Sequence, residues 1–434
     1  MDIGIYGLSL TGVVTAVSLA HVGNNVVLMP APGESLQMVE WQSLLSDEPG
    51  LLAAFNKEQL EGRLKVEVDH QKLLPGKDAH FLALDPDAYA SLDKWLGLDQ
   101  LVDERVLLII QTAVPVGTAE RLQASIAQNW AKQGFSSPYA VVSMPDFIRQ
   151  GTALDNFQRP GRVLVGCDVD WPRALMRDIL RPFNRNRDSL LFMSSREAEF
   201  SKFVVNGMLA TKLSFMNEMA NLAELLDVDI EKVRHGVGSD SRIGYDYIYP
   251  GCGFGGAHFS ADIIRLAAQV EQSGGHGNLL QSVLKINEQQ KEVLFRKLWC
   301  HYQGQLKGRT VAVWGASFKP NTSSIRNAPS LVLMEALWAQ GCSVRLHDPK
   351  ALDNVRELLG DREDLVLCSD PYEAVAGADA LLLMTEWKDY WSPDYRRLMQ
   401  LLKTPLVLDG RNIYDPYLMA ERGFIYQGVG RRTA

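Results

Sequence analysis

The sequence has few features of a secreted, membrane-spanning or nucleic-acid-binding protein. No Lys or Arg precedes Lys57, so the apolar first residues lack the positive region of a signal peptide. Gly4, Gly7 and Gly12 interrupt that stretch well short of a membrane span. Lys and Arg form no cluster, and 44 basic against 52 acidic residues leave a formal net charge of -8, which argues against nucleic acid as a partner. We therefore predict a cytoplasmic protein that neither crosses a membrane nor binds nucleic acid.

Cysteine is scarce as well. The five cysteines are odd in number and widely separated, and no two of them have the spacing of metal ligands: Cys167, Cys252, Cys300, Cys342 and Cys368. This pattern is typical of reduced thiols and argues against a disulfide framework or a structural zinc site. No metal site is predicted.

The sequence does contain enough apolar residues for large cores. With 434 residues and 46% hydrophobic content, two to three domains are expected. The chain begins as a βαβ unit, with a strand Asp2 to Tyr6, a helix that runs through His21 and stops at Gly23, and a strand Asn25 to Met29. Further apolar runs predict a parallel sheet that continues to about residue 190: residues 80–84, 106–110, 139–143 and 163–166.

The middle of the chain predicts one long helix, from Ser194 to about Leu226, with apolar residues near helical spacing and no proline. It exceeds the usual helix length, so we expect it to link two lobes and to pack against a second copy of the chain, as in a homodimer. A glycine-dense loop follows, from Tyr249 to Gly256, whose backbone can approach a ligand closely.

The last third predicts a second βαβ unit. Its first strand ends at Gly315, its helix runs from Pro329 to Gln340, and its next strand runs from Ser343 to Leu346. The predicted fold class is therefore α/β, with two Rossmann-like doubly wound domains joined by a central long-helix region. The predicted boundaries are 1–190, 191–302 and 303–434.

The first turn, Gly7-Leu-Ser-Leu-Thr-Gly12, is an incomplete dinucleotide fingerprint. Ser9 takes the place of the second glycine, which lets the backbone approach a pyrophosphate, and Pro30 follows the second strand, where a carboxylate for the ribose is expected. No arginine lies nearby to accept a 2′-phosphate. Taken alone, the fingerprint favours a Rossmann domain with weak or no NAD binding. The candidate cofactor-binding residues are Gly7, Ser9, Leu10 and Gly12.

Longer motifs occur in order along the whole chain. They are Glu48-Pro-Gly-Leu51, Pro145-Asp-Phe-Ile-Arg-Gln-Gly151, Lys202-Phe-Val-Val-Asn206, Gly238-Ser-Asp-Ser-Arg-Ile-Gly244, Gly315-Ala-Ser-Phe-Lys-Pro-Asn-Thr322, Ile325-Arg-Asn-Ala-Pro-Ser330, Thr385-Glu-Trp387 and Asp409-Gly-Arg-Asn-Ile-Tyr414. Together these motifs resemble the UDP-glucose/GDP-mannose dehydrogenase family. The resemblance covers essentially the whole chain, up to Gly430.

The resemblance implies an N-terminal NAD domain, a central helical dimerisation region and a C-terminal domain that binds the nucleotide of a nucleotide-sugar. It implies NAD as the cofactor, oxidation of a CH–OH group of a UDP- or GDP-sugar, and a role in polysaccharide synthesis. Lys319 and Arg326 are cations that could neutralise the diphosphate, and Arg242 matches an arginine that reaches into the partner subunit's site. The implied substrate-binding residues are Asp146, Arg242, Tyr247, Gly253, Phe254, Gly255, Phe318, Lys319, Arg326 and Arg411.

The implied catalytic residues are partly changed. In the family, a cysteine in Gly-Gly-Ser-Cys-Phe-Pro-Lys-Asp captures the aldehyde and carries it to a thioester, which water hydrolyses to the acid. Here the motif reads Gly255-Gly-Ala-His-Phe-Ser-Ala-Asp262. His258 can take a proton but offers no sulfur, so oxidation through to the acid is not expected. Lys202, Asn206 and Asp262 are retained; by resemblance they stabilise the oxyanion and hold a water, and the alternative is a buried ion pair that supports packing.

Other departures leave two hypotheses open. Ala113 and Gln150 replace a hydroxyl and a carboxylate of the family pattern, and Asp146 replaces a glutamate. Cys252, six residues before His258, is a weaker candidate for a displaced nucleophile. The first hypothesis is a divergent oxidoreductase that stops at the aldehyde. The second is a non-catalytic homologue that binds a nucleotide-sugar, or regulates an active relative, in polysaccharide biosynthesis.

Overall fold

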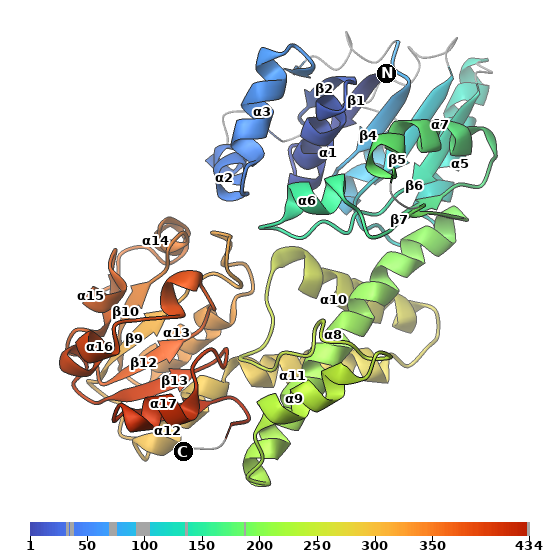
Figure 1. Cartoon of the computed structure of the whole chain (residues 1–434). Helices are drawn as coiled ribbons and strands as arrows, with labels where there is room; N and C mark the ends of the chain where they lie inside the picture. Colours follow the sequence, from blue (N-terminus) through green and yellow to red (C-terminus); the bar gives the residue numbers. More distant parts are fainter. Residues whose placement is uncertain are drawn as a thin grey trace. The chain divides into compact units, whose positions relative to one another are not determined.

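The structure is a computed structural model that describes residues 1–31, 34, 39–68, 76–92, 105–134, 138–185 and 188–431. The chain forms two compact units, residues 1–204 and residues 205–434 (Figure 1). The division falls within the long helix α8 (Ser195–Leu225). The predicted three-part division at residues 190 and 302 stays a prediction.

The first unit is built on a sheet whose described strands follow the order β3-β2-β1-β4-β5-β6-β7-β8. Nearly all neighbours are parallel, but β6 and β7 pair antiparallel, at Ser143 and Gly166. The central strands are buried on both faces, as expected for a parallel sheet covered by helices. The strands are β1 (Asp2–Tyr6), β2 (Asn25–Met29), β3 (Leu64–Val66), β4 (Ala79–Leu82), β5 (Val106–Ile110), β6 (Tyr139–Ser143), β7 (Val163–Gly166) and β8 (Leu190–Met193).

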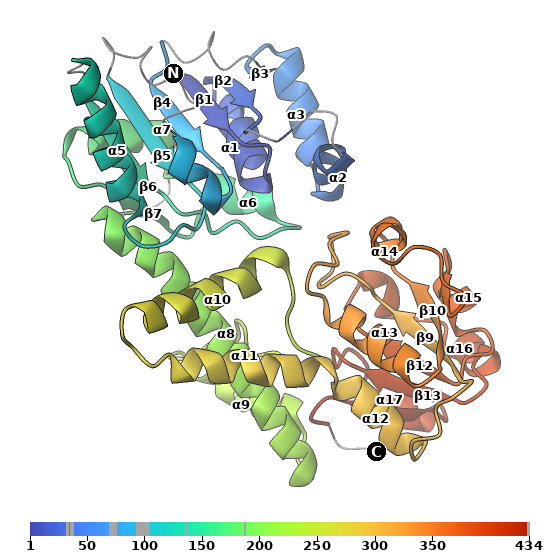
Figure 2. The same ribbon diagram turned by 180° about the vertical axis from the view of Figure 1, so that it is seen from behind.

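Helices cover both faces of this sheet. Helices α1, α3, α6 and α7 contribute to the core on one face, and α5 and the 3₁₀ turn η2 to the core on the other. Figures 1 and 2 show these two faces from opposite sides. The elements are α1 (Leu10–His21), α2 (Val39–Asp47), α3 (Leu51–Leu60), η2 (Pro86–Ser91), α5 (Thr118–Gln133), α6 (Ala153–Gln158), α7 (Trp171–Leu180) and η4 (Arg181–Phe183).

The second unit begins with the rest of α8 and four further helices: α9 (Ile230–Ser239), α10 (Ala257–Gln272), α11 (Asn278–Lys291) and α12 (Val293–His301). A small core of Ala210, Phe254, Ile263 and Val283 joins α8, α10 and α11. Because Phe254 belongs to the glycine-dense loop, this core also fixes the position of that loop.

A second sheet follows, and within residues 205–431 its order is β11-β10-β9-β12-β13-β14, all parallel. The strands are β9 (Thr310–Trp314), β10 (Ser343–His347), β11 (Leu365–Leu367), β12 (Ala380–Leu383), β13 (Leu406–Asp409) and β14 (Ile425–Gly428). Both sheets therefore share the order 3-2-1-4-5-6 in their first six strands. Parallel strands in that order place the turn after the first strand at a ligand-binding edge.

Helices α12 and α13 pack on one face of the second sheet, and α15, α16 and α17 pack on the other. Several of these helices begin at an aspartate whose carboxylate accepts backbone N–H groups, as Asp370 does for α15, which fixes where each helix starts. The bounds are α13 (Pro329–Ala339), α14 (Leu352–Leu359), α15 (Pro371–Val375), η5 (Lys388–Tyr390), α16 (Tyr395–Leu401) and α17 (Pro416–Glu421).

The predicted fold class is confirmed: two parallel-sheet domains are joined by a long helix. The predicted helix from Ser194 to about Leu226 corresponds to α8, and the predicted first βαβ unit has the observed bounds. Two features of the sheet were not predicted, namely the antiparallel pairing of β6 with β7 and the additional strand β8.

Candidate functional site

The turn after β1 has the backbone geometry of a dinucleotide-binding turn. Gly7 has φ +111°, and a Cβ there would lie 2.3 Å from the Ala83 carbonyl oxygen. A Cβ on Gly12 would lie 2.2 Å from the Gly7 carbonyl oxygen. Both positions therefore require glycine. Helix α1 begins at Leu10, so the four predicted cofactor residues form this turn and the first turn of the helix.

Ser9 fits into this turn without distorting it. Its hydroxyl donates to the Ala83 carbonyl oxygen at 2.9 Å and accepts the Gly12 N–H at 3.3 Å. Ser9 is thus the N-cap of α1, and its side chain is held against the end of β4. The missing second glycine is replaced by a residue that caps the helix.

A carboxylate does lie beside this turn, although Pro30 follows β2. Glu34 Oε2 accepts the Leu8 N–H at 2.8 Å and the Ala31 N–H at 2.7 Å. An acidic residue therefore lies beside the turn, although Pro30 takes the place that directly follows the strand. Glu34 was not predicted, because it follows the strand end by several positions; an acidic residue in this loop was the available signal.

Lys202 and Asp146 meet at the loop after β6. The Lys202 ammonium donates to the Asp146 carbonyl oxygen at 2.5 Å and lies 3.9 Å from its carboxylate. It also lies 4.9 Å from the centre of the Phe147 ring. The Asp146 carboxylate accepts the Thr11 hydroxyl of α1 at 2.6 Å. This places Lys202 and Asp146, a predicted catalytic residue and a predicted substrate-binding residue, next to the first turn of α1.

The other end of that loop is fixed by Glu48. Its buried carboxylate accepts the Gly151 N–H and the Ala153 N–H, both at 2.6 Å. Charge-assisted hydrogen bonds of this kind are among the stronger ones in proteins. The Glu48-Pro-Gly-Leu51 motif therefore acts structurally, by holding the loop that carries Asp146.

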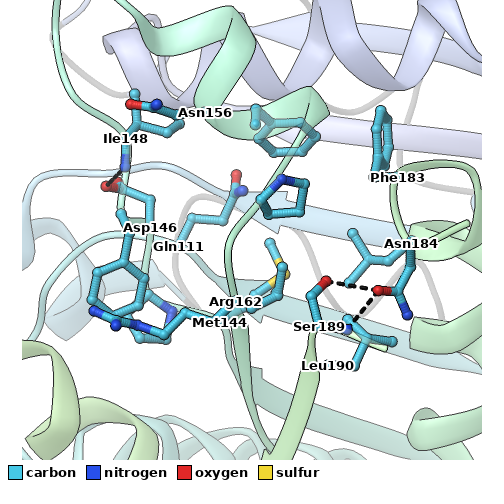
Figure 3. Close-up of a pocket in the computed structure, with 16 residues that line it drawn as sticks. Gln111, Met144, Asp146, Ile148, Asn156, Arg162, Phe183, Asn184, Ser189 and Leu190 are labelled. Atoms are coloured by element: carbon cyan, nitrogen blue, oxygen red, sulfur yellow. Dashed lines mark hydrogen bonds between the residues drawn. The ribbon is translucent and has the colours of Figure 1, made fainter. Parts of the chain in front are cut away.

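A small cavity of about 60 Å³ lies behind the same loop (Figure 3). Asp146, Ile148 and Arg162 line it, and Gln111 at the end of β5 reaches it with its side chain. The Gln111 amide donates to the Thr15 hydroxyl at 2.9 Å, and its oxygen has no donor among the described residues. The remaining wall is largely apolar, so the cavity offers few groups that could recognise a sugar.

In the second unit, three buried amides hold the glycine-dense loop. Asn217 accepts the Gly251 N–H at 2.9 Å, and Gln290 donates to the Gly251 carbonyl at 2.8 Å. Asn287 accepts the Phe254 N–H at 2.8 Å and donates to its carbonyl at 3.1 Å. Buried polar groups are costly unless they are paired, so this pairing fixes the shape of the loop.

The predicted glycines of the loop pack against the segment between β9 and α13. A Cβ on Gly255 would lie 2.4 Å from the Asn327 carbonyl oxygen, and a Cβ on Gly256 would lie 3.0 Å from the Phe318 ring. The Gly256 N–H donates to the Arg326 carbonyl at 2.9 Å. The structure thus places Phe318 and Arg326 next to the loop.

Helix α10 starts immediately after the loop. Asp262, in its first turns, is buried and accepts the Asn206 amide at 2.8 Å. Arg265 lies 3.6 Å from the same carboxylate. His258 is the second residue of α10; its side chain lies outside the described residues. Asp262 therefore lies one helical turn after position 258, and it is paired with Asn206 of α8.

A chain of polar groups that the sequence did not reveal runs beneath the loop. Lys291, 1% exposed, donates to the Asn327 amide oxygen at 2.7 Å, and the Asn327 amide donates to the Ser260 hydroxyl at 2.8 Å. Glu288 pairs with the same lysine at 2.9 Å. No spacing rule marks one lysine of an amphipathic helix as buried, so only the structure shows this link.

Arg411 lies under the same loop and is held by backbone and side-chain oxygens. Its guanidinium donates to the Met384 carbonyl at 2.7 Å and lies 3.1 Å from the Glu386 carboxylate. Cys252 packs nearby; it is fully buried, and burial raises the pKa of its thiol. A thiol kept protonated and inaccessible is a poor nucleophile, which argues against Cys252 as a displaced catalytic residue.

The remaining predicted substrate residues lie in different surroundings. Tyr247 has φ +61° and its ring lies 6.2 Å from that of Phe259, which in turn contacts Phe254 at 5.2 Å. Arg242 is exposed and pairs with Asp240 at 2.6 Å. The Lys319 ammonium lies 5.5 Å from the centre of the Phe318 ring.

The turn after β9 has the same backbone arrangement as the turn after β1. In the turn after β9, both oxygens of the Asp348 carboxylate accept hydrogen bonds from the protein. The Gly315 N–H donates to the last residue of β10, as the Gly7 N–H donates to the last residue of β2, both at 2.8 Å. Asp348 Oδ2 accepts the N–H groups of Ala316 and Ser317, the Ser317 hydroxyl and the Trp387 indole. Asp348 Oδ1 accepts two more N–H groups, from residues 350 and 351.

The described residues form neither a metal site nor a membrane span. No group of three or more His, Cys, Asp or Glu side chains among them could hold a metal ion. No helix in the described ranges is long and apolar enough to cross a membrane. All five cysteines lie in described segments, and each is a free thiol.

Comparison with known proteins covers the whole chain. Three domains of the UDP-glucose/GDP-mannose dehydrogenase family match it: the NAD binding domain at residues 1–184, the central domain at 196–289 and the UDP binding domain at 312–416. A UDP-glucose 6-dehydrogenase of Pseudomonas aeruginosa is 41% identical over 445 residues, covering 100% of this chain and 98% of that protein. A Rhizobium meliloti UDP-glucose 6-dehydrogenase is 31% identical, covering 99% and 100%.

A solved structure is similar over the same extent. The UDP-glucose dehydrogenase of Pyrobaculum islandicum has a TM-score of 0.85 and 30% sequence identity, and the match covers 99% of this chain and 98% of that one. The UDP-D-ManNAc dehydrogenase of Pyrococcus horikoshii, with a TM-score of 0.83 and 21% identity, shares the fold.

Proposed function

The chain belongs to the UDP-glucose/GDP-mannose dehydrogenase family, and we propose that it oxidises a CH–OH group of a UDP-sugar with NAD and stops at the aldehyde. The named relatives support UDP-glucose as the first substrate to test. The turn after β1 supplies the residues proposed for NAD, and the glycine-dense loop with its neighbours supplies most of those proposed for the nucleotide-sugar. The observation that carries the proposal is the buried pair of Asn206 on α8 and Asp262 on α10, the helix that follows a loop held in one shape by three amides.

The first unit fits NAD at the turn after β1. Gly7 and Gly12 keep the close backbone approach, the N-terminus of α1 favours a pyrophosphate, and Glu34 supplies a carboxylate. When bound there, NAD would accept a hydride from the sugar carbon. Loss of that hydride and of one proton would turn the alcohol into an aldehyde, with the hydride kept as NADH.

The chain's own groups act on the oxygen that loses this proton. An alkoxide develops during hydride transfer, and an ammonium or amide donor placed beside it lowers the barrier. Lys202 and Asn206 are donors of these two kinds, and each is held by an acceptor, Asp146 or Asp262. By family resemblance they stabilise the oxyanion.

The proposed end point follows from position 258. A thioester requires a sulfur, and His258 provides none. Buried Cys252 does not replace it, because its thiol is inaccessible and its pKa is raised. The aldehyde therefore has no covalent route to the acid.

We also propose that the chain forms a homodimer through α8. Met208, Phe215 and Leu222 are exposed and lie seven residues apart, so they share one face of the helix. Exposed apolar stripes of this kind are typical of interfaces. The free thiols support the predicted cytoplasmic location.

The test is product analysis at high enzyme concentration with NAD and UDP-glucose, and separately with GDP-mannose. The expected result is one NADH per sugar consumed and an aldehyde that hydroxylamine traps, identified by mass spectrometry. Two NADH per sugar and a uronic acid would overturn the end point.

Absence of NADH with every sugar would instead support the second candidate, a non-catalytic nucleotide-sugar-binding or regulatory homologue in polysaccharide biosynthesis. The observation that favours it is Ser9, whose side chain occupies the turn where a glycine gives a pyrophosphate room.

A further inference from the structure

Glu34 lies at the position where dinucleotide-binding folds recognise a ribose. In such folds an acidic residue at the end of the second strand accepts the ribose hydroxyls. Here the strand ends at Met29, Pro30 follows, and Glu34 returns to the turn and accepts the N–H groups of Leu8 and Ala31. We infer that Glu34 binds the adenosine ribose of NAD in place of the missing strand-end carboxylate; this rests on the proposed function.

The use of its two oxygens supports this assignment. Both backbone N–H groups bond to Oε2. Among the described residues, no donor bonds to Oε1. One oxygen therefore fixes the side chain in place, and the other is left to accept a hydrogen bond, which a ribose hydroxyl can donate.

The equivalent carboxylate of the second unit shows the contrast. Asp348 directly follows β10, and both of its oxygens accept hydrogen bonds from the protein. Asp348 is 2% exposed, whereas Glu34 is half-buried. In the second unit, both oxygens of Asp348 are bonded to the protein, so its role is structural. In the first unit, Oε1 of Glu34 accepts no hydrogen bond from the described residues and can accept one from a ligand.

The assignment also predicts which cofactor is chosen. A carboxylate that accepts from the 2′-hydroxyl repels the 2′-phosphate of NADP, because both are negative and close together. The chain should therefore bind NAD much more tightly than NADP. Replacing Glu34 by glutamine removes the charge and keeps the side-chain length. This variant should bind NAD more weakly, and the difference between its affinities for NAD and NADP should be smaller than in the wild type.

The experiment is calorimetric titration of the full chain with NAD and with NADP, for the wild type, Glu34→Gln and Glu34→Ala. Glu61→Gln is the matched control, since it makes the same change of charge at an exposed site of the same unit. We expect Glu34→Gln to bind NAD about tenfold to a hundredfold more weakly, the range for hydrogen bonds to charged groups. The control should bind as the wild type does. Thermal melting and UDP-glucose binding of each variant confirm that it is folded.

Three results would overturn the inference, and they are distinguishable from one another. A wild type that binds UDP-glucose but not NAD contradicts the proposed cofactor as well. A wild type that binds NAD, with Glu34→Gln unchanged, contradicts only the role of Glu34. Tighter NAD binding by Glu34→Ala would show that the carboxylate blocks the turn rather than binding a ribose there.

Discussion

The turns after β1 and after β9 share one backbone arrangement but differ in how completely the protein's own groups pair with the carboxylate. In both, a glycine with positive φ donates its N–H to the last residue of the neighbouring strand, and a carboxylate accepts N–H groups of the turn. In the second unit, Asp348, Ser317 and Trp387 fill the turn with the protein's own groups. In the first, Glu34 fills it only in part. One Rossmann turn can therefore serve as a structural core or as a ligand site, according to whether its carboxylate keeps an oxygen that accepts no hydrogen bond from the protein.

The comparison predicts its largest effect for Asp348→Ala. Removal of this carboxylate leaves several buried donors unpaired, at about 1–3 kcal/mol each, so the second unit should lose at least about 3 kcal/mol of stability. Glu34→Ala should cost the first unit less stability, because Glu34 is only half-buried and accepts two backbone N–H groups rather than several. Hydrogen exchange of β9 and of β1 measures the two effects separately.

Asp348→Asn is the matched control, because it keeps an accepting oxygen and the side-chain shape. It should lie between the wild type and Asp348→Ala. Equal stability of Asp348→Ala and the wild type would contradict the structural role of this carboxylate.

A change of product is expected from His258→Cys. A thiol at position 258 supplies the sulfur that a thioester needs, so a uronic acid and a second NADH per sugar should appear. The rate should stay low, because Ala113, Gln150 and Ala261 keep their departures from the family pattern. His258→Ser is the control, since a hydroxyl of similar size should give no acid. If His258→Cys also yields only the aldehyde, the missing thiol is not what stops the reaction.

Arg411 allows the assignment of ligands to the two units to be tested. Arg411→Ala removes the cation under the glycine-dense loop and its bonds to Met384 and Glu386. UDP-glucose binding should weaken about tenfold to a hundredfold, while NAD binding should be unchanged. Arg411→Lys keeps the charge and should lose less. Arg396→Ala, at an exposed position of the same unit, is the control. If Arg411→Ala also lost affinity for NAD, the assignment of NAD and UDP-glucose to different units would be contradicted.

The smallest expected effect is an opposite pH dependence of the two units. Glu58 is buried, which by itself raises its pKa, but hydrogen bonds and charges from His21 and Arg63 outweigh burial and hold the pKa below its usual 4.5. Burial raises the pKa of Asp409 above its usual 3.8. Ionised Glu58 stabilises the folded first unit above pH 4.5, and this stabilisation is lost as pH falls through its lowered pKa. For Asp409 the protonated form is favoured in the folded second unit, so its contribution to stability is present below pH 3.8 and is lost as pH rises through its raised pKa.

Hydrogen exchange of each sheet at several pH values measures this contrast. Acidification should favour the second unit relative to the first, and Glu58→Gln with Asp409→Asn should reduce the contrast. The same pH slope in both units, unaffected by the two substitutions, would be incompatible with these pKa directions.

The sequence was sufficient for the features that depend on local pattern. The strands Asp2–Tyr6 and Asn25–Met29 and the helix α8 follow from the periodicity of apolar residues, and the structure confirms them. Strand β8 was missed because four residues before a long helix give too short a pattern. The antiparallel pairing of β6 with β7 depends on packing between distant segments, which periodicity does not encode.

The candidate site was predicted where motifs are contiguous, and was missed where the chain folds back. The glycine-dense loop and Arg411 were recognisable as motifs. Glu34 was not, because it reaches the turn from a loop after the strand rather than from the strand end. Lys291 was not either, since a helix sequence does not reveal which lysine is buried under a neighbouring loop.

The most direct test of the central claim is a calorimetric titration of the wild-type chain with NAD, with and without UDP-glucose. If the turn after β1 is a working cofactor site with Glu34 as its acid, NAD should bind with a dissociation constant in the micromolar range. Binding of UDP-glucose without any binding of NAD would contradict that claim and leave the chain as a nucleotide-sugar-binding protein without a cofactor.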